Sequence, residues 1–128
     1  MIHVADTHPL VWYLDNSPRL SATADAILGD PAARIVIPAM SLAEIAYLHD
    51  RGRIPVALRT ILAHVHRLSN WSIHPLDEEV ARLLPATLNI HDGVIVATAL
   101  VYQARGETTA LITKDAAITA TGLVPVIW

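Results

Sequence analysis

The opening stretch of the chain decides the fold, and it reads Ile2-His3-Val4-Ala5-Asp6-Thr7-His8-Pro9-Leu10-Val11-Trp12-Tyr13-Leu14. Its first residues favour extended backbone and predict a strand over 2–5. Pro9 stands where the first turn of a helix tolerates proline, and the apolar run that follows it predicts a helix. The chain therefore begins with a strand, an aspartate and a helix, and Asp6 stands at the junction.

The same alternation continues along the chain. Further strands are expected over 34–37, 71–73, 110–113 and 124–127. Further helices are expected over 22–28, 41–51, 55–70, 78–84 and 92–105, with a small helix or turn before the last strand. The run from Gly93 to Val101 is almost wholly apolar, so its helix should be buried on most sides. This order predicts an α/β fold with a mainly parallel central sheet flanked by helices.

Length and composition exclude several classes of protein. The 128 residues fit one domain over 1–128, and 53% hydrophobic with 16% charged residues excludes a disordered chain. The absence of cysteine excludes a disulfide framework, a Cys-bound metal site and a cysteine nucleophile. The net charge of −3 excludes a polycationic nucleic-acid binder, so any contact with nucleic acid has to be local.

No stretch of the sequence is predicted to enter a membrane. The longest uncharged stretches are too short for a bilayer, or contain Pro125, and no Lys or Arg precedes Arg19. We therefore expect a soluble, cytoplasmic protein. Its high apolar content favours a partner surface, such as a homodimer interface.

Four carboxylates stand where such a sheet presents its site. Asp6 follows the first strand, Glu44 lies in the first turn of the helix after the second strand, Asp92 opens the apolar helix, and Asp115 follows the strand over 110–113. Ligand sites of parallel sheets lie beyond the carboxyl ends of the strands. Four acids held together repel one another unless a divalent cation neutralises them, and oxygen ligands favour Mg²⁺ or Mn²⁺.

Each acid also has a purely structural interpretation. Asp92 is a good N-cap for its helix, and Asp115 after Lys114 is typical of a turn. Ser41-Leu42-Ala43-Glu44 matches a capping box, in which Glu44 reaches back to the backbone N–H of Ser41. Asp6 is harder to explain in this way, because a carboxylate at the end of a buried strand needs a partner, a cap role or a metal.

Other common site motifs are missing. The seven histidines show no spacing that favours a metal site. The sequence also lacks the nucleophile elbow of hydrolases, the P-loop and the dinucleotide-binding glycine motif. Any phosphate chemistry would have to depend on a metal.

Four segments together resemble the PIN-domain ribonucleases, and most closely the VapC-like toxins of type II toxin–antitoxin systems. The segments are Val4-Ala5-Asp6-Thr7-His8 with Leu10 and Trp12, Ser41-Leu42-Ala43-Glu44-Ile45, His91-Asp92-Gly93-Val94-Ile95-Val96-Ala97-Thr98-Ala99, and Leu111-Ile112-Thr113-Lys114-Asp115. Their order and spacing cover essentially the whole chain. The resemblance implies a PIN-like three-layer fold in a single nuclease domain.

The resemblance also implies a site and partners. It implies a catalytic site of Asp6, Glu44, Asp92 and Asp115, with Thr113 as an orienting hydroxyl. Asp6 and Asp92 would bind Mg²⁺ or Mn²⁺ directly, Asp115 would complete the metal ligands, and Glu44 would act through water. The implied activity is endoribonuclease cleavage, in a dimer that a VapB-like antitoxin blocks. Such toxins commonly carry Arg where this chain has Gly93, so a basic group is either missing or supplied by another residue, such as Lys114 or an arginine of the 51–67 segment.

One segment is a candidate for holding RNA. Between His49 and His74 four arginines stand against Asp50 alone. A solvated helix face would explain them, but an acidic pocket that binds RNA needs nearby cations. The predicted RNA-binding residues are Arg51, Arg53, Arg59 and Lys114.

Other functions fit less well. A haloacid dehalogenase phosphatase needs a second Asp where this chain has His8, and a receiver domain needs paired acids near its first strand. A weakly active PIN-scaffold interaction module would be expected to lose acids, and none of the four is lost. A PIN-type nuclease that acts on DNA or a flap stays open as the alternative, because nothing in the sequence reads a 2′-hydroxyl.

Overall fold

The computed structural model describes residues 1–128 and confirms the α/β fold class. The strands are β1 (Ile2–Ala5), β2 (Arg34–Pro38), β3 (Trp71–His74), β4 (Thr109–Ile112) and β5 (Val126–Ile127). The helices are α1 (Thr7–Leu14), α2 (Ala22–Leu28), α3 (Ala39–Asp50), α4 (Leu58–Arg67), α5 (Glu78–Arg82), α6 (Ile90–Ala104) and α7 (Ala116–Thr121).

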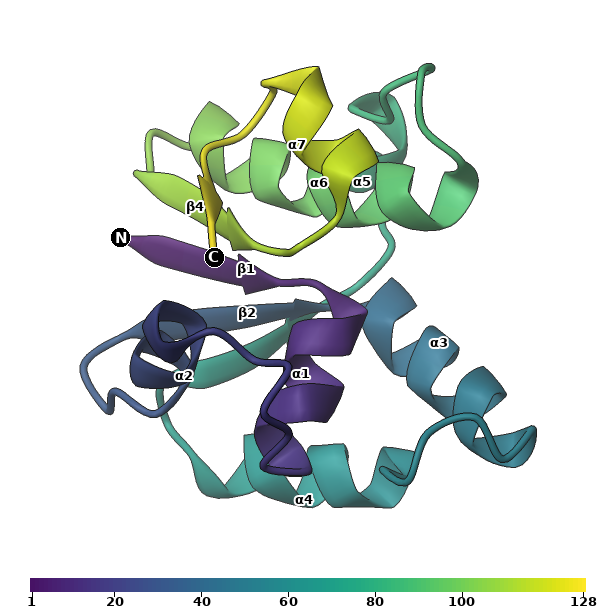
Figure 1. The fold of residues 1–128 in the computed structure, drawn as a ribbon. Helices are drawn as coiled ribbons and strands as arrows, with labels where there is room; N and C mark the ends of the chain where they lie inside the picture. The colour runs from purple at the N-terminus through teal and green to yellow at the C-terminus, as the bar shows by residue number, and fades with distance from the viewer.

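The five strands form one sheet in the order β3-β2-β1-β4-β5, and every neighbouring pair is parallel. The central strand β1 pairs Val4 with Val36 of β2 on one side and with Leu111 of β4 on the other. In Figure 1, β1 and β2 point toward the side of the molecule on which α1 and α3 begin. Segments that follow different strands are therefore gathered at one edge.

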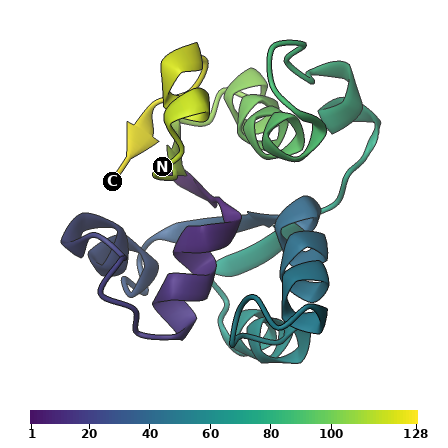
Figure 2. The ribbon, with the colours of Figure 1, turned by 45° about the vertical axis from the view of Figure 1, so that its right-hand side comes forward.

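Helices cover both faces of the sheet and make three layers. Helices α1 to α4 lie on one side and α5 to α7 on the other, as both ribbon views show (Figures 1 and 2). Side chains alternate between the faces along each strand. Ala5, Ile35 and Ile37 belong to the core beneath α1 and α4, whereas Ile2, Val4 and Val36 belong to the core beneath α6. The apolar stretch of α6 is buried, as its sequence predicts.

Several predicted boundaries are wrong. The helices expected over 55–70 and 78–84 are shorter, at Leu58–Arg67 and Glu78–Arg82. Helix α3 begins at Ala39, directly after Pro38, and not at Ser41. Helix α6 begins at Ile90 with Asn89 as its N-cap, and not at Asp92. The predicted last strand over 124–127 is reduced to Val126–Ile127.

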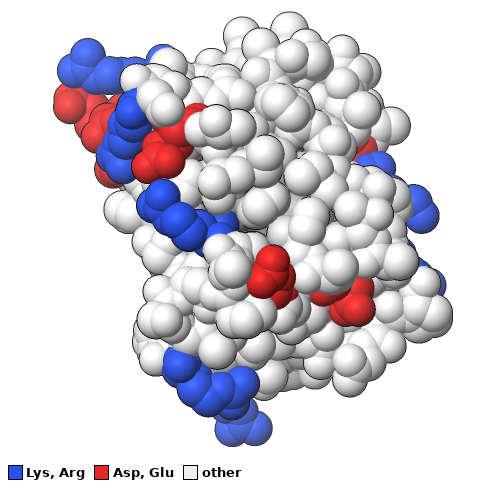
Figure 3. Space-filling view, turned by 90° about the vertical axis from the view of Figure 1, so that its left-hand side faces the viewer, with Lys and Arg blue, Asp and Glu red and all other residues white.

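Part of the surface charge is already paired. Figure 3 shows the side of the molecule that lies to the left in Figure 1, where blue and red atoms are intermingled at the upper left of the view. Three ion pairs account for six of the charged residues, Arg34–Glu107 at 3.3 Å, Arg82–Glu78 at 3.2 Å and Arg105–Glu79 at 3.1 Å. These arginines have acidic partners within the chain.

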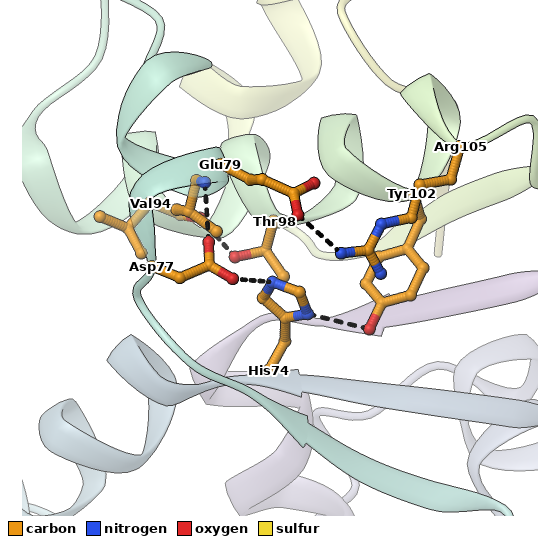
Figure 4. A network of polar contacts seen from close by, with 8 residues as sticks. His74, Asp77, Glu79, Val94, Thr98, Tyr102 and Arg105 are labelled. Carbon is orange, nitrogen blue, oxygen red and sulfur yellow. Dashed lines mark hydrogen bonds and ion pairs between the residues drawn. The ribbon is translucent and has the colours of Figure 1, made fainter.

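A polar network joins the edge strand β3 to α5 and α6 (Figure 4). The buried His74 contacts the hydroxyl of Tyr102 through Nδ1 at 3.0 Å and lies 3.3 Å from Asp77 through Nε2. Asp77 also accepts a hydrogen bond from Val80 N–H at 3.0 Å and so caps α5. This network fixes the helices on one face of the sheet. None of the side chains described in it is hydrogen-bonded to Asp6, Glu44, Asp92 or Asp115. No helix of the protein has the length and apolar character needed to cross a membrane.

Candidate active site

Asp6 lies at the carboxyl end of the central strand and is the most buried of the four acids. Its side chain is only 8% exposed, and it forms no ion pair. Oδ1 accepts a hydrogen bond from Thr7 N–H at 2.7 Å, and Oδ2 accepts one from the Thr113 hydroxyl at 2.7 Å. Burial raises the pKa of Asp6, the two hydrogen bonds oppose this rise, and the negative charge of Asp92 adds to it.

Thr7 connects Asp6 to Glu44. The Thr7 hydroxyl is buried and donates to Oε1 of Glu44 at 3.1 Å, while its backbone N–H binds Asp6. Burial also raises the pKa of Glu44, and the charge of Asp6 contributes to the same shift. Sequence reasoning gave Thr7 no role, although a hydroxyl directly after Asp6 at a helix start was a usable signal.

The capping box predicted for Ser41 and Glu44 is wrong. Helix α3 has no side-chain cap, and the Ser41 hydroxyl is buried and donates to the carbonyl of Ala5 at 3.4 Å. Ser41 therefore ties α3 to β1. Glu44 is left free to point toward the acidic cluster.

Asp92 is held by Asn89, a residue that sequence reasoning missed. The Asn89 side chain accepts a hydrogen bond from Asp92 N–H at 3.0 Å and donates one to Oδ2 of Asp92 at 2.8 Å. Asn89 is the N-cap of α6, so Asp92 is not the cap that the sequence allowed it to be. The Asn-x-x-Asp spacing at a helix start was the signal available in the sequence.

Thr113 links Asp6 to Asp115. Its buried hydroxyl donates to Asp6 and accepts a hydrogen bond from Asp115 N–H at 3.0 Å. The Asp115 carboxylate accepts from Ile118 N–H at 2.9 Å and so caps α7. Two threonines therefore join Asp115, Asp6 and Glu44 into one hydrogen-bonded chain.

The acids do not form a ready-made metal cage, because no three His, Asp or Glu side chains lie close enough together to hold an ion among themselves. The donors nevertheless fit a hard cation. Each Asp6 oxygen accepts one hydrogen bond and keeps a free lone pair. Mg²⁺ commonly keeps several waters and needs one or two protein carboxylates. The donor set therefore suits a hydrated divalent ion, which one or two of the acids would bind directly and the others would hold through water.

Two cavities open beside the acids. The first has a volume of about 430 Å³ and is lined by Asp6, His8, Pro9, Trp12, Arg19, Lys114 and Asp115. The second has a volume of about 450 Å³ and is lined by Met40, Ala43, Glu44, Tyr47, Leu48 and His91. The first is lined mainly by charged and aromatic residues, and the second mainly by apolar ones.

The four predicted RNA-binding residues do not all lie at the same cavity. Lys114 lines the cavity of Asp6 and Asp115, and Arg53 lines an adjoining cavity. Arg51 instead packs over the ring of Tyr47, 3.5 Å from its centroid. Arg59 is exposed on α4 and lines neither cavity.

The protein has a parallel sheet between two layers of helices and a buried acid at the end of its central strand. It therefore belongs to the class of α/β domains with an acidic site. The family model described as "PIN domain" matches residues 4–122, and the chain belongs to this family. PIN domains form a family of nucleases, so the chain falls in the nuclease class.

A solved structure is similar to this chain in its fold. It is the crystal structure of VapBC2 from Rickettsia felis bound to a DNA fragment from their promoter. The match has a TM-score of 0.68 at 14% identity and covers 99% of this chain and 98% of that one. No curated protein matches the sequence.

Proposed function

We propose that the protein is a metal-dependent endoribonuclease that acts as the toxin of a toxin–antitoxin pair. The observation that carries the proposal is the buried, unpaired Asp6 carboxylate, which is linked through threonines to Glu44 and Asp115 and lies near enough to Asp92 for their charges to repel. Burial of a carboxylate without an ion pair is unfavourable, and a divalent cation bound beside it offsets that cost. Membership of the PIN family supports hydrolysis of a nucleic acid as the reaction.

In this proposal each acid has its own role. Mg²⁺ or Mn²⁺, when bound, lowers the pKa of a coordinated water and stabilises charge on the leaving oxygen. Asp6 and Asp92 bind the ion, and Asp115 completes its surroundings. Glu44, held through Oε1 alone, orients the attacking water with its other oxygen. Thr7 and Thr113 keep the carboxylates in place.

A partner is part of the same proposal. Several large apolar side chains are exposed. Tyr47 lines the Glu44 cavity, and Leu83, Leu84 and Ile90 lie between the end of α5 and the start of α6. Exposed apolar side chains of this size suit a homodimer interface or a VapB-like antitoxin. The VapBC2 complex, to which the fold is similar, supports the antitoxin.

The test is cleavage by the purified protein. End-labelled single-stranded RNA, the matching DNA and a flap duplex are incubated with the chelated protein and then with Mg²⁺ or Mn²⁺. We expect cleavage of RNA that stops in EDTA and returns with either metal, and that is lost in Asp6→Asn. Cleavage of DNA or the flap in preference to RNA favours the alternative PIN nuclease, and metal-independent cleavage contradicts the site.

The toxin role has a separate test in cells. Expression of the protein should arrest growth, and co-expression of the reading frame immediately upstream should relieve the arrest. Sedimentation of the protein alone should give a dimer. A monomer that no neighbouring gene product neutralises would contradict the partner part of the proposal.

A further inference from the structure

A second cavity lies along α1 beside the cavity around Asp6 and Asp115, and the two together form a trough. The second cavity is lined by Val11, Asp15, Ser17, Arg53, Ile54 and Pro55, and it shares His8, Trp12 and Arg19 with the first. The shared residues place the two cavities next to each other. A chain lying in this trough would pass directly from the acids to Arg53.

Aromatic rings form one wall of this trough. The His8 and Trp12 rings have centroids 5.7 Å apart at 49°, and Trp12 meets Trp128 edge-on at 5.7 Å. Trp12 packs partly on the core and keeps the rest of its surface in both cavities, and His8 is exposed. Lys114 lies over the Trp128 ring at 6.0 Å. Flat aromatic surface beside cations suits a nucleobase next to a phosphate.

The cations of the trough have no acidic partner. Arg19, Arg53 and Lys114 are absent from all four ion pairs of the protein, whereas Arg34, Arg82 and Arg105 are each paired. Cations without internal partners are available to phosphate groups. The cavity on the other side of the acids contains no Lys or Arg and is mainly apolar. The phosphate chain is therefore better accommodated on the α1 side.

From this arrangement we infer that the trough along α1 binds a single-stranded segment of the substrate, with one unpaired base stacked on Trp12 and the flanking phosphates on Arg19 and Lys114. The inference rests on the proposed nuclease function and adds the residues that hold one base and its flanking phosphates. A paired base keeps its faces within the duplex, so stacking on Trp12 requires an unpaired one. Trp12 is then a residue that selects the nucleotide beside the cleaved bond.

The test is a coupling experiment on binding. A short single-stranded RNA is made with an abasic nucleotide at each position in turn, and its affinity is measured in Mg²⁺ buffer for Asp6→Asn protein, which does not cleave. We expect one position at which loss of the base weakens binding about tenfold, which is the scale of one base stacked on an aromatic ring. Adding Trp12→Ala should weaken binding of intact RNA by a similar factor and should abolish the effect of the abasic nucleotide. Trp12→Phe should retain most of the effect.

Controls separate stacking from folding. Tyr102→Ala removes a partly buried aromatic ring on the other side of the sheet and should leave RNA affinity unchanged. Arg19 is exposed, and Arg19→Ala should reduce the salt slope of binding by about one phosphate contact. Arg82→Ala, whose cation is paired with Glu78, should not change that slope.

The outcomes distinguish this inference from the proposed function. If the losses of affinity from the abasic nucleotide and from Trp12→Ala are independent and multiply, the trough is overturned. An unchanged salt slope in Arg19→Ala also overturns it. In both cases the protein still binds RNA, and the proposed function is unaffected. Tighter binding of a duplex than of the single strand also overturns the trough. No binding and no cleavage of any nucleic acid by the wild-type protein in Mg²⁺ removes the nuclease proposal, and the trough with it.

Discussion

The hydroxyl of Thr113 donates a hydrogen bond of 2.7 Å to Oδ2 of Asp6, and the two residues are 107 positions apart in the chain. They meet because β1 and β4 are parallel neighbours, with Ala5 paired to Ile112, so each residue directly follows its strand at the same edge. The same hydroxyl accepts from Asp115 N–H. Thr113 therefore sets the position of two acids at once.

We expect Thr113→Val to lower RNA cleavage about 10–100-fold, which is the usual effect of removing a group that orients a metal ligand. Valine has nearly the same shape but cannot donate to Asp6 or accept from Asp115. The measurement is kcat/KM on a labelled RNA at saturating Mg²⁺. Thr113→Ser, which keeps the hydroxyl, should retain most of the activity, and equal losses in both variants would contradict an orienting role.

The fold was predictable from the alternation of short apolar runs and helical patterns. Asp6 and Asp115 lie where the sequence predicts them, beyond the ends of β1 and β4, because parallel strands end at the same edge of a sheet. The last strand was predicted too long. Pro125 joins β4 through its carbonyl alone, which accepts from Leu111 N–H at 2.8 Å.

The errors at the site arose where tertiary contacts override local preferences. Ser41 and Glu44 have the spacing of a capping box, but Ser41 is buried against the carbonyl of Ala5 and α3 begins two residues earlier, at Ala39. Glu44 pairs instead with Thr7, a contact between two helices that no local pattern encodes. The α1 trough was missed for the same reason, since Lys114 comes from a part of the chain far from Trp12 and Arg19.

Glu44→Gln separates a structural from a chemical role for this residue. Glutamine keeps a carbonyl oxygen that can accept from the Thr7 hydroxyl, so the contact between α1 and α3 should survive. We expect unchanged thermal unfolding and at least a tenfold fall in cleavage, because the charge that orients the attacking water is lost. Near-normal cleavage by Glu44→Gln would show that Glu44 has only a structural role.

Asn89→Ala should affect both stability and activity. Loss of the N-cap of α6 costs about 1 kcal/mol of folding free energy, measured as a lower midpoint in urea. Asp92 also loses the amide that holds its carboxylate at 2.8 Å, so cleavage should fall more than the loss of stability explains. Asn89→Asp is the matched comparison, because it can still cap the helix but places a second negative charge beside Asp92. We expect it to restore stability without restoring activity, and recovery of both would show that only the cap matters.

Asp6→Asn should abolish cleavage and at the same time make the metal-free protein more stable. The wild-type carboxylate is buried without an ion pair and is repelled by Asp92, so it opposes folding. Asparagine removes the charge and keeps the volume. Its oxygen can accept from Thr7 N–H, and its amide can donate to the Thr113 hydroxyl, which has lone pairs for two donors.

We expect Asp6→Asn to have a higher unfolding temperature than the wild type in EDTA, measured by circular dichroism. Added Mg²⁺ should raise the unfolding temperature of the wild type and change that of Asp6→Asn little, because only the wild type has the charge that binds the ion. A variant less stable than wild type in EDTA, or equally stabilised by Mg²⁺, would show that Asp6 is a structural cap of α1 and not a ligand.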